Sequence, residues 1–201
     1  MKILVLGDIH GNLPALELVL DTFSKEVDQI VCHGDVVNYG PWSNECVECL
    51  NSIDCITLKG NHEDAYINGF YPGSNPLVHK FFEKTYATFK HLEIIKKYNE
   101  VYHFQDYVVV HTINNSYYYP DSDLSHLDLE QNHIIGHSHY PFIRTLENGK
   151  ILANTGSVGQ NRVNLSLANC IILDTAINSI EVKTLEFDTT ALITEMKLRD
   201  Y

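Results

Sequence analysis

The stretch Ile3-Leu4-Val5-Leu6-Gly7-Asp8-Ile9-His10 places a carboxylate and an imidazole directly after a short, unbroken apolar run. A run of this length predicts a strand that is buried on both faces. Helical spacing follows over Leu13–Phe23, where Asn12 is suited to be the N-cap and Pro14 fits the first turn. A second apolar run, Gln29–Cys32, predicts the next strand. The chain therefore begins as strand, helix and strand.

The same alternation continues through the first half of the chain. A helix is expected over Asn44–Leu50 and a third strand over Cys55–Leu58. This β-α-β-α-β order predicts a parallel sheet with right-handed crossovers. The segment Tyr66–Asn75 is rich in Gly, Pro and aromatic residues and predicts a loop. Asn75-Pro76 then starts a helical region that runs to about Tyr98.

The second half of the chain changes to short strands separated by turn signals. The expected strands are Val101–Phe104, Tyr107–Val110, His133–Ile135, Phe142–Leu146, Ile151–Ala153, Ala168–Leu173 and Ile180–Leu185. A closing helix is expected over Thr190–Leu198. We therefore predict one domain over residues 1–201 with an α/β fold: two packed mixed β-sheets flanked by helices, in a four-layer αββα sandwich. Strand pairing should be parallel in the first half and largely antiparallel in the second.

The composition is that of a soluble globular protein, with 44% hydrophobic and 20% charged residues. The formal net charge of −12 argues against binding to long nucleic acid, which requires a basic face. Bound cations can still make a site in an acidic protein attractive to anions. No apolar run approaches the length of a membrane span, and the first residues lack the features of a secretory signal. We therefore expect a cytoplasmic protein without membrane contact.

Five cysteines without a secretion signal fit a reducing compartment. Cys46 and Cys49 have the spacing of a redox or zinc pair, but no second pair matches them, and both fall in the expected helix. Redox or metal chemistry stays open for this pair, and packed thiols are the interpretation that we favour.

Side chains that can bind metals follow the predicted strands at five places. They are Asp8 and His10, Asp35, Asn61, His111, and His137 with His139. Functional groups of α/β folds gather where strands end, so we expect these side chains to meet at one edge. Carboxylate, carboxamide and imidazole are ligands of divalent first-row metals, and their number suits two ions better than one. Manganese is the ion that we expect first, and Fe, Zn, Ni and Co tolerate the same ligands.

His62 directly follows Asn61 and is expected above the metals rather than on them. A titratable imidazole in that place can protonate a leaving oxygen or stabilise a transition state. Two ions about 3.5–4 Å apart are the usual clamp for displacement at phosphorus. For His33, which precedes Gly34-Asp35, a supporting contact to the ligands stays open. The remaining histidines are interpreted as ordinary core or surface imidazoles: His79, His91, His103, His126 and His133.

These motifs, in this order and over nearly the whole length, resemble the calcineurin-like metallophosphoesterase superfamily. The matching blocks are Gly7-Asp8-Ile9-His10-Gly11-Asn12, Gly34-Asp35-Val36-Val37-Asn38-Tyr39-Gly40-Pro41, Gly60-Asn61-His62-Glu63, His111 and Gly136-His137-Ser138-His139. The segment Asn154-Thr155-Gly156-Ser157-Val158-Gly159-Gln160-Asn161-Arg162 is similar to the Gly-Ser-Val-Gly-Gln segment of the small bacterial and archaeal phosphodiesterase branch. The resemblance implies one metal on Asp8, His10, Asp35 and His139, and a second on Asp35, Asn61, His111 and His137. It also implies that His62 is the catalytic imidazole.

The implied activity is that of a dinuclear-metal-dependent phosphoesterase. It would hydrolyse a small phosphodiester, phosphomonoester or nucleotide by attack of a metal-bridging hydroxide, with His62 assisting the leaving group. Ser/Thr protein phosphatases of this superfamily carry Asp and then Arg-Gly where this chain has Asn38-Tyr39-Gly40, so protein phosphatase activity is not expected. Asn38 could bind substrate or hydrogen-bond the catalytic imidazole. Arg162 is a candidate phosphate contact, with a surface ion pair as an equal alternative.

Other interpretations assign the chain to a different functional class of protein. Some members of this superfamily have become scaffolds, so a catalytically silent metal-binding scaffold or protein-interaction module is the alternative to an enzyme. A zinc-stabilised structural domain would unfold on chelation.

The irregular segment 113–130, with Tyr117-Tyr118-Tyr119-Pro120, is either a surface loop or a rim that stacks an aromatic group above the metals. The expected partner is a small phosphorylated substrate or nucleotide, and the oligomeric state is left open.

Overall fold

Strand β1 (Lys2–Leu6) lies in the middle of the first of two sheets, and its side chains alternate between two cores. The computed structural model describes residues 1–201. Leu4 and Leu6 belong to a core shared with the helices, while Ile3 and Val5 belong to the core between the two sheets. Because both faces of the strand are buried, its sequence is an unbroken apolar run.

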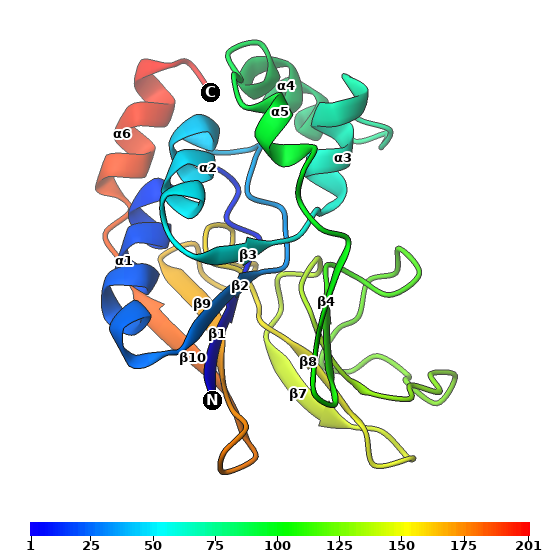
Figure 1. Ribbon diagram of the computed structural model, residues 1–201. Coiled ribbons are helices and arrows are strands. Elements are labelled where there is room, and N and C mark those ends of the chain that lie inside the picture. The colour runs from blue at the N-terminus through cyan, green and yellow to red at the C-terminus, as the bar shows by residue number, and fades with distance from the viewer.

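The first sheet has the strand order β10-β9-β1-β2-β3 (Figure 1). Its other strands are β2 (Gln29–Cys32), β3 (Cys55–Thr57), β9 (Leu167–Asp174) and β10 (Ser179–Glu186). The three strands from the first half of the chain are parallel, as the sequence predicts. Strands β9 and β10 extend the sheet in antiparallel pairs on the other side of β1. The chain therefore returns to the first sheet after it has formed the second.

The second sheet has the order β4-β5-β6-β8-β7. Its strands are β4 (Val101–Phe104), β5 (Tyr107–Val110), β6 (Asn132–Ile135), β7 (Phe142–Thr145) and β8 (Ile151–Asn154). The pairs β5–β6 and β6–β8 are parallel, whereas β4–β5 and β7–β8 are antiparallel. This sheet contains both kinds of pair, and with the pairs of β9 and β10 included, antiparallel pairing predominates in the second half of the chain, as expected. The β5–β6 pair is parallel because the long segment 111–131 returns the chain to the same end of the sheet, which a tight turn cannot do.

Helices lie beside the first sheet and across one end of the molecule (Figure 1). They are α1 (Leu13–Phe23) with the short turn η1 (Ser24–Glu26), α2 (Ser43–Ser52), α3 (Asn61–Asn68), α4 (Pro76–Tyr86), α5 (Leu92–Ile95) and α6 (Thr190–Leu198). Helix α3 is absent from the expected elements, and the loop predicted over Tyr66–Asn75 begins only after Asn68. The first turn of α3 is polar and gives no apolar periodicity. The Glu63 carboxylate stabilises this turn by accepting a hydrogen bond from the Gly60 N–H.

The helical region predicted as far as Tyr98 is interrupted between α4 and α5. Asn44, on α2, spans the gap with its side-chain amide, which donates to the Thr88 carbonyl at 3.0 Å and accepts from the Lys90 N–H at 2.8 Å. These bonds satisfy backbone groups that a continuous helix would pair internally. The interruption is therefore set by a contact from another helix.

Apolar cores hold the layers together. The largest lies between the first sheet and the helices, and a second lies between the two sheets. A third lies on the second sheet, where Tyr118 and Leu124 of segment 113–130 pack with Ile135 and Leu152. The fold is thus the predicted α/β arrangement of two mixed sheets flanked by helices, in which this segment also covers sheet surface. None of the helices combines the length and the apolar character that crossing a bilayer requires.

All five cysteines carry free thiols. Cys46 is buried in the largest core, and Cys49 packs against the edge of that core. Burial raises the pKa of the Cys46 thiol well above its usual range, which disfavours the thiolate that redox or metal chemistry needs. The environment of this pair therefore favours packed thiols.

Candidate metal centre

All seven predicted metal ligands and His62 come together where the ends of several strands meet. Asp8 and His10 follow β1, Asp35 follows β2, Asn61 begins α3, His111 follows β5, and His137 and His139 follow β6. Overlapping groups of three side chains have ligand atoms within 4.8 Å of one another. These groups are Asp8-His10-His139, Asp8-His33-His111, His10-Asp35-His62 and Asp35-His111-His137. Both sheets therefore contribute to one site.

The backbone at the site is held in the left-handed conformation. Positive φ angles occur at Asp8, His10, Asp35, His137 and His139, which are five of the seven predicted ligands. A residue with a Cβ atom rarely adopts this conformation, which costs about 1–3 kcal/mol. Hydrogen bonds between the loops enforce it, among them Ile9 N to Asp35 O at 2.8 Å and Gly159 N to Asp8 O at 3.0 Å. The loops thus fix the ligands at a cost in stability.

Two glycines let the loops approach the carboxylates closely. A Cβ atom at Gly60 would lie 2.1 Å from Oδ1 of Asp35. A Cβ atom at Gly136 would lie 2.4 Å from Oδ2 of Asp8 and 2.0 Å from the ring of His33. A larger residue at either position would displace a carboxylate, so packing against the ligands requires both glycines.

Each carboxylate uses one oxygen for the backbone and leaves the other for the site. Oδ2 of Asp8 accepts a hydrogen bond from the His137 N–H, and Oδ1 of Asp35 accepts one from the His62 N–H, both at 2.9 Å. The remaining oxygen of Asp8, Oδ1, is buried and has no hydrogen-bond partner. Oδ2 of Asp35 faces imidazoles from both halves of the chain at 3.3–3.9 Å. Buried carboxylate oxygens of this kind are stabilised when a cation binds beside them.

The first cluster of ligand atoms contains His10 and His139, whose Nε2 atoms lie 3.1 Å apart. The Nδ1 atoms of the two rings contact backbone carbonyls, of Val37 at 3.2 Å and of Gln160 at 2.8 Å. A carbonyl only accepts, so each Nδ1 carries a proton and each neutral ring presents a bare Nε2 lone pair. Two lone pairs that face each other at this distance repel unless a proton or a metal cation lies between them. Oδ1 of Asp8 lies 3.8 and 3.4 Å from the two nitrogens and supplies negative charge.

The second cluster is centred on Nε2 of His111. This atom lies 3.1 Å from Oδ1 of Asn61, 3.1 Å from Nδ1 of His137 and 3.3 Å from Oδ2 of Asp35. Because the same Asp35 oxygen also faces the first cluster, the two clusters share this carboxylate. The arrangement corresponds to the two ligand sets that the family resemblance implies.

The donor atoms are spaced as ligands of divalent cations would be. Nitrogen and oxygen ligands at about 2.0–2.2 Å from a zinc ion lie about 3.0–3.5 Å from one another. The shortest separations in the two clusters, 3.1–3.4 Å, fall in that range. The residues therefore fit two divalent cations. One would be held by Asp8, His10, Asp35 and His139, and the other by Asp35, Asn61, His111 and His137.

The buried charges of the site depend on one another. Burial alone would raise the pKa of Asp8 and of Asp35, but His139 beside Asp8 and His111 beside Asp35 hold both pKa values well below their usual range. Burial lowers the pKa of His137 to about 4. Burial also opposes the charging of His111, yet the charge and hydrogen bond of Asp35 raise its pKa to about 9. Without metal, His111 in the second cluster is therefore doubly protonated and positively charged at neutral pH.

His62 is oriented by Asn38, which is completely buried. Oδ1 of Asn38 accepts from the Tyr39 N–H at 2.8 Å, so its amide nitrogen donates to Nδ1 of His62, also at 2.8 Å. The neutral ring then carries its proton on Nε2, which lies 3.9 Å from Oδ2 of Asp35. Burial lowers the pKa of His62, which keeps the ring neutral. Of the two roles expected for Asn38, the structure contains the contact with the imidazole.

Glu63, for which the sequence predicts no role, is fully buried beside the site. Its carboxylate accepts four backbone N–H bonds, from Asp35 at 2.7 Å, Val36 at 2.8 Å, Val37 at 3.2 Å and Gly60 at 2.8 Å. Burial and the charge of Asp35 raise the pKa of Glu63 to about 7, and the backbone donors oppose this rise. Glu63 thereby shapes the loop that carries Asp35. Its position three residues after Gly60, the spacing of a capping residue, is the signal that could have identified it.

His33 lies against the ligands, the contact that the sequence leaves open. Its Nε2 contacts the Thr155 hydroxyl at 2.7 Å, and its ring atoms lie near those of Asp8 and His111. Nδ1 of His33 is buried without a partner. None of the five histidines interpreted as ordinary imidazoles belongs to these groups.

Tyrosines surround the site. Tyr117 stacks on His137 with ring centroids 4.0 Å apart, and Tyr39 packs edge-on against His10 at 4.8 Å. Tyr117 is 55% exposed, so segment 113–130 contributes to the rim of the site as well as to the third core. Burial raises the pKa of both phenols, and the positive charge of Arg162 opposes that rise. Arg162 is exposed and forms no ion pair, which disfavours the alternative of a surface ion pair.

These motifs and layers are shared with known proteins. A family model described as calcineurin-like phosphoesterase matches residues 1–161. The uncharacterized protein MJ0912 of Methanocaldococcus jannaschii is 31% identical, in an alignment that covers 92% of this chain and 88% of that protein. Phosphodiesterase YfcE of Escherichia coli is 50% identical over 42 residues, or 20% of this chain and 23% of YfcE. The crystal structure of a metallophosphoesterase from Sphaerobacter thermophilus matches with a TM-score of 0.80 and 25% identity, and covers 100% of this chain and 95% of that one.

Proposed function

The chain belongs to the calcineurin-like phosphoesterase family, and from that premise we propose that it hydrolyses small phosphoesters with two bound divalent cations. Manganese is the proposed ion, and the cytoplasm the proposed compartment. The observation that carries the proposal is the pair of bare Nε2 atoms of His10 and His139, 3.1 Å apart. Nε2 of His10 lies 3.8 Å from an Asp35 oxygen that faces both clusters. A cation bound between the two nitrogens would relieve the repulsion of their lone pairs, and the shared carboxylate suits two cations.

The catalytic role proposed for His62 follows from its hydrogen bond to Asn38. Bound cations would supply positive charge for the phosphoryl oxygens and would lower the pKa of a water nucleophile. His62 presents Nε2–H toward the same space and can hydrogen-bond the leaving oxygen as negative charge develops there. Because Asn38 holds the ring, little reorganisation is needed at the moment of reaction. His62 would thus act first as a hydrogen-bond donor.

The proposed substrate is a small ester, with a phosphodiester placed before a monoester. Arg162 is exposed and free of an ion pair, and we assign it the contact with a phosphoryl oxygen. Asn38 stands where protein phosphatases of the superfamily carry Asp, so a phosphoprotein is not proposed. The name of the Escherichia coli relative, phosphodiesterase, supports the preference for a diester.

The test compares bis-p-nitrophenyl phosphate with p-nitrophenyl phosphate, using chelator-stripped protein with and without Mn²⁺. We expect metal-dependent release of p-nitrophenol, faster from the diester. Asp35→Asn should abolish it, and His62→Ala should reduce kcat about 100-fold or more. His103→Ala, which alters an exposed histidine on β4, serves as the control. Full activity of the Asp35 and His62 variants would refute the assigned roles. Complete metal occupancy without turnover on a broad phosphoester panel would instead indicate the scaffold interpretation.

A further inference from the structure

An apolar cavity adjoins the metal centre beside helix α6. This α6 cavity has a volume of about 260 Å³. Its apolar wall is formed by Leu192, Ile193 and Met196 of α6, Phe81 of α4 and Leu165. Tyr39 and His10 also line it. The cavity therefore borders His10, a proposed ligand of the first cluster.

Helix α6 leaves its apolar side chains uncovered. No residue of this helix is buried, although Leu192, Ile193 and Met196 are apolar. An apolar helix face normally packs against a core, but here these side chains line the cavity, and Ile193 is 47% exposed. An apolar group bound in the cavity would remove this surface from water.

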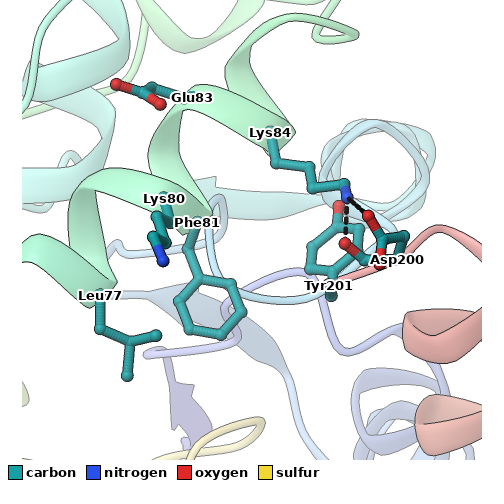
Figure 2. A pocket seen from close by; sticks show the side chains of 7 residues that line it. All are labelled: Leu77, Lys80, Phe81, Glu83, Lys84, Asp200 and Tyr201. Atoms are coloured by element: carbon teal, nitrogen blue, oxygen red, sulfur yellow. Dashed lines mark hydrogen bonds and ion pairs between the residues drawn. The ribbon is translucent and has the colours of Figure 1, made fainter.

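The wall formed by α6 is tied to the body of the protein. The Arg199 guanidinium, next to the end of the helix, donates to the Pro41 carbonyl in the loop that also holds Tyr39. Figure 2 shows the next residue, Asp200, in contact with Lys84 of α4, the helix that also carries Phe81. Phe81 lines both the α6 cavity and the hollow drawn there. These contacts hold the C-terminal end of α6 in position relative to the metal centre.

We propose that the α6 cavity receives an aromatic ring attached to the phosphoryl group, so that it selects aryl or nucleoside-like esters over small alkyl esters. The proposal rests on the proposed function. A cavity of about 150 Å³ is known to bind benzene, so the α6 cavity has room for one or two fused rings. Tyr39 and Phe81, which pack edge to face at 5.6 Å, offer aromatic contacts. The Gln160 amide, whose oxygen is buried without a partner, is available to a polar ring edge.

Phenylphosphonate and methylphosphonate provide a direct test, because they share the anionic group and differ only in the substituent. Their binding to the Mn²⁺-loaded protein would be measured by isothermal titration calorimetry. We expect phenylphosphonate to bind at least about tenfold more tightly. Ile193→Trp, which fills the cavity, and Ile193→Asp, which places a charge in it, should bring the ratio close to one. Neither should change the affinity for methylphosphonate. Ile177→Trp, at a position that is 74% exposed outside the cavity, is the matched control.

Equal affinities in the unaltered protein would overturn the proposal. A preference for phenylphosphonate that survives both Ile193 variants would also overturn it, because the ring would then bind elsewhere. Either result leaves the proposed function standing if metal-dependent hydrolysis of bis-p-nitrophenyl phosphate is observed. Loss of that hydrolysis would count against the proposed function itself.

Discussion

The amide nitrogen of Asn38 lies 2.8 Å from Nδ1 of His62 and fixes which ring nitrogen carries the proton. Asn38→Asp would reverse this preference, because a carboxylate accepts from Nδ1–H and leaves the neutral ring without a proton on Nε2. The added negative charge should raise the pKa of His62 above that of the unaltered enzyme. The variant should therefore act only while His62 is doubly protonated, so that kcat falls as pH rises through the raised pKa.

The measurement is a pH profile of kcat with saturating Mn²⁺. The unaltered enzyme should show no such descending limb, because Nε2 keeps its proton in the neutral ring. Asn178→Asp, at an exposed turn position, controls for the added charge. Identical profiles for Asn38→Asp and the unaltered enzyme would show that His62 donates no proton or hydrogen bond in the rate-determining step.

Metal binding should release a proton from His111. The pKa of this group is raised to about 9, so the ring is doubly protonated at pH 7 in the metal-free protein. A histidine that binds a metal must be neutral, so the second proton is lost on binding. The apparent affinity of the second cluster should therefore rise about tenfold per pH unit up to pH 9. Calorimetry with Mn²⁺ in two buffers of different ionisation enthalpy measures the release, which should be about one proton. The same binding enthalpy in both buffers would contradict the protonated state assigned to His111.

Glu63→Gln should destabilise the metal-free protein by about 3 kcal/mol or more. Each oxygen of Glu63 accepts two backbone N–H bonds, and the amide nitrogen of Gln would face two of these donors. Urea unfolding of the chelated protein measures the loss of stability. Glu181→Gln removes an exposed carboxylate paired with Lys183 and should leave the free energy of unfolding nearly unchanged. Equal effects of the two substitutions would show that the four backbone contacts of Glu63 contribute little.

Chelation should leave the protein folded. The three apolar cores lie outside the ligand clusters, so their burial does not depend on a metal. Bound cations should nevertheless raise the melting temperature, because they bind the folded state in preference to the unfolded one. Circular dichroism and thermal unfolding with and without a chelator measure both effects. Unfolding on chelation at 25 °C would support the interpretation as a metal-stabilised structural domain.

The sequence predicts most of the strands and helices because each has its own periodicity. The unbroken run at Ile3–Leu6 and the helical spacing over Leu13–Phe23 are local signals that the structure confirms. Two features escaped this reasoning, one because its signal is not an apolar periodicity and the other because it depends on a distant contact. Helix α3 begins in a polar turn stabilised by Glu63, and Asn44 closes the gap between α4 and α5 from another helix.

The candidate site, like the fold, has features that the sequence predicts and features that it does not. The identity and order of the candidate ligands are visible in the sequence because each follows a predicted strand. Only part of the role of Glu63 is visible: its spacing from Gly60 indicates a helix cap, but its bonds to backbone groups of Asp35 and Val36, more than 25 positions away, are not indicated. Nor does the sequence indicate that Tyr117 stacks on a ligand while its neighbour Tyr118 fills the third core.

The ligands of the two clusters come from opposite ends of a long stretch of chain, and this bears on the order of assembly during synthesis. Asp8 and His10 leave the ribosome early, whereas His137 and His139 emerge only after most of the second sheet. A nascent chain can therefore offer only part of either ligand set, and full-strength metal capture must wait for tertiary structure. Once loaded, each ion would fasten early and late segments to one another, as a covalent crosslink does in secreted proteins. In a chain with five free thiols, the proposed metals would take the place of disulfides.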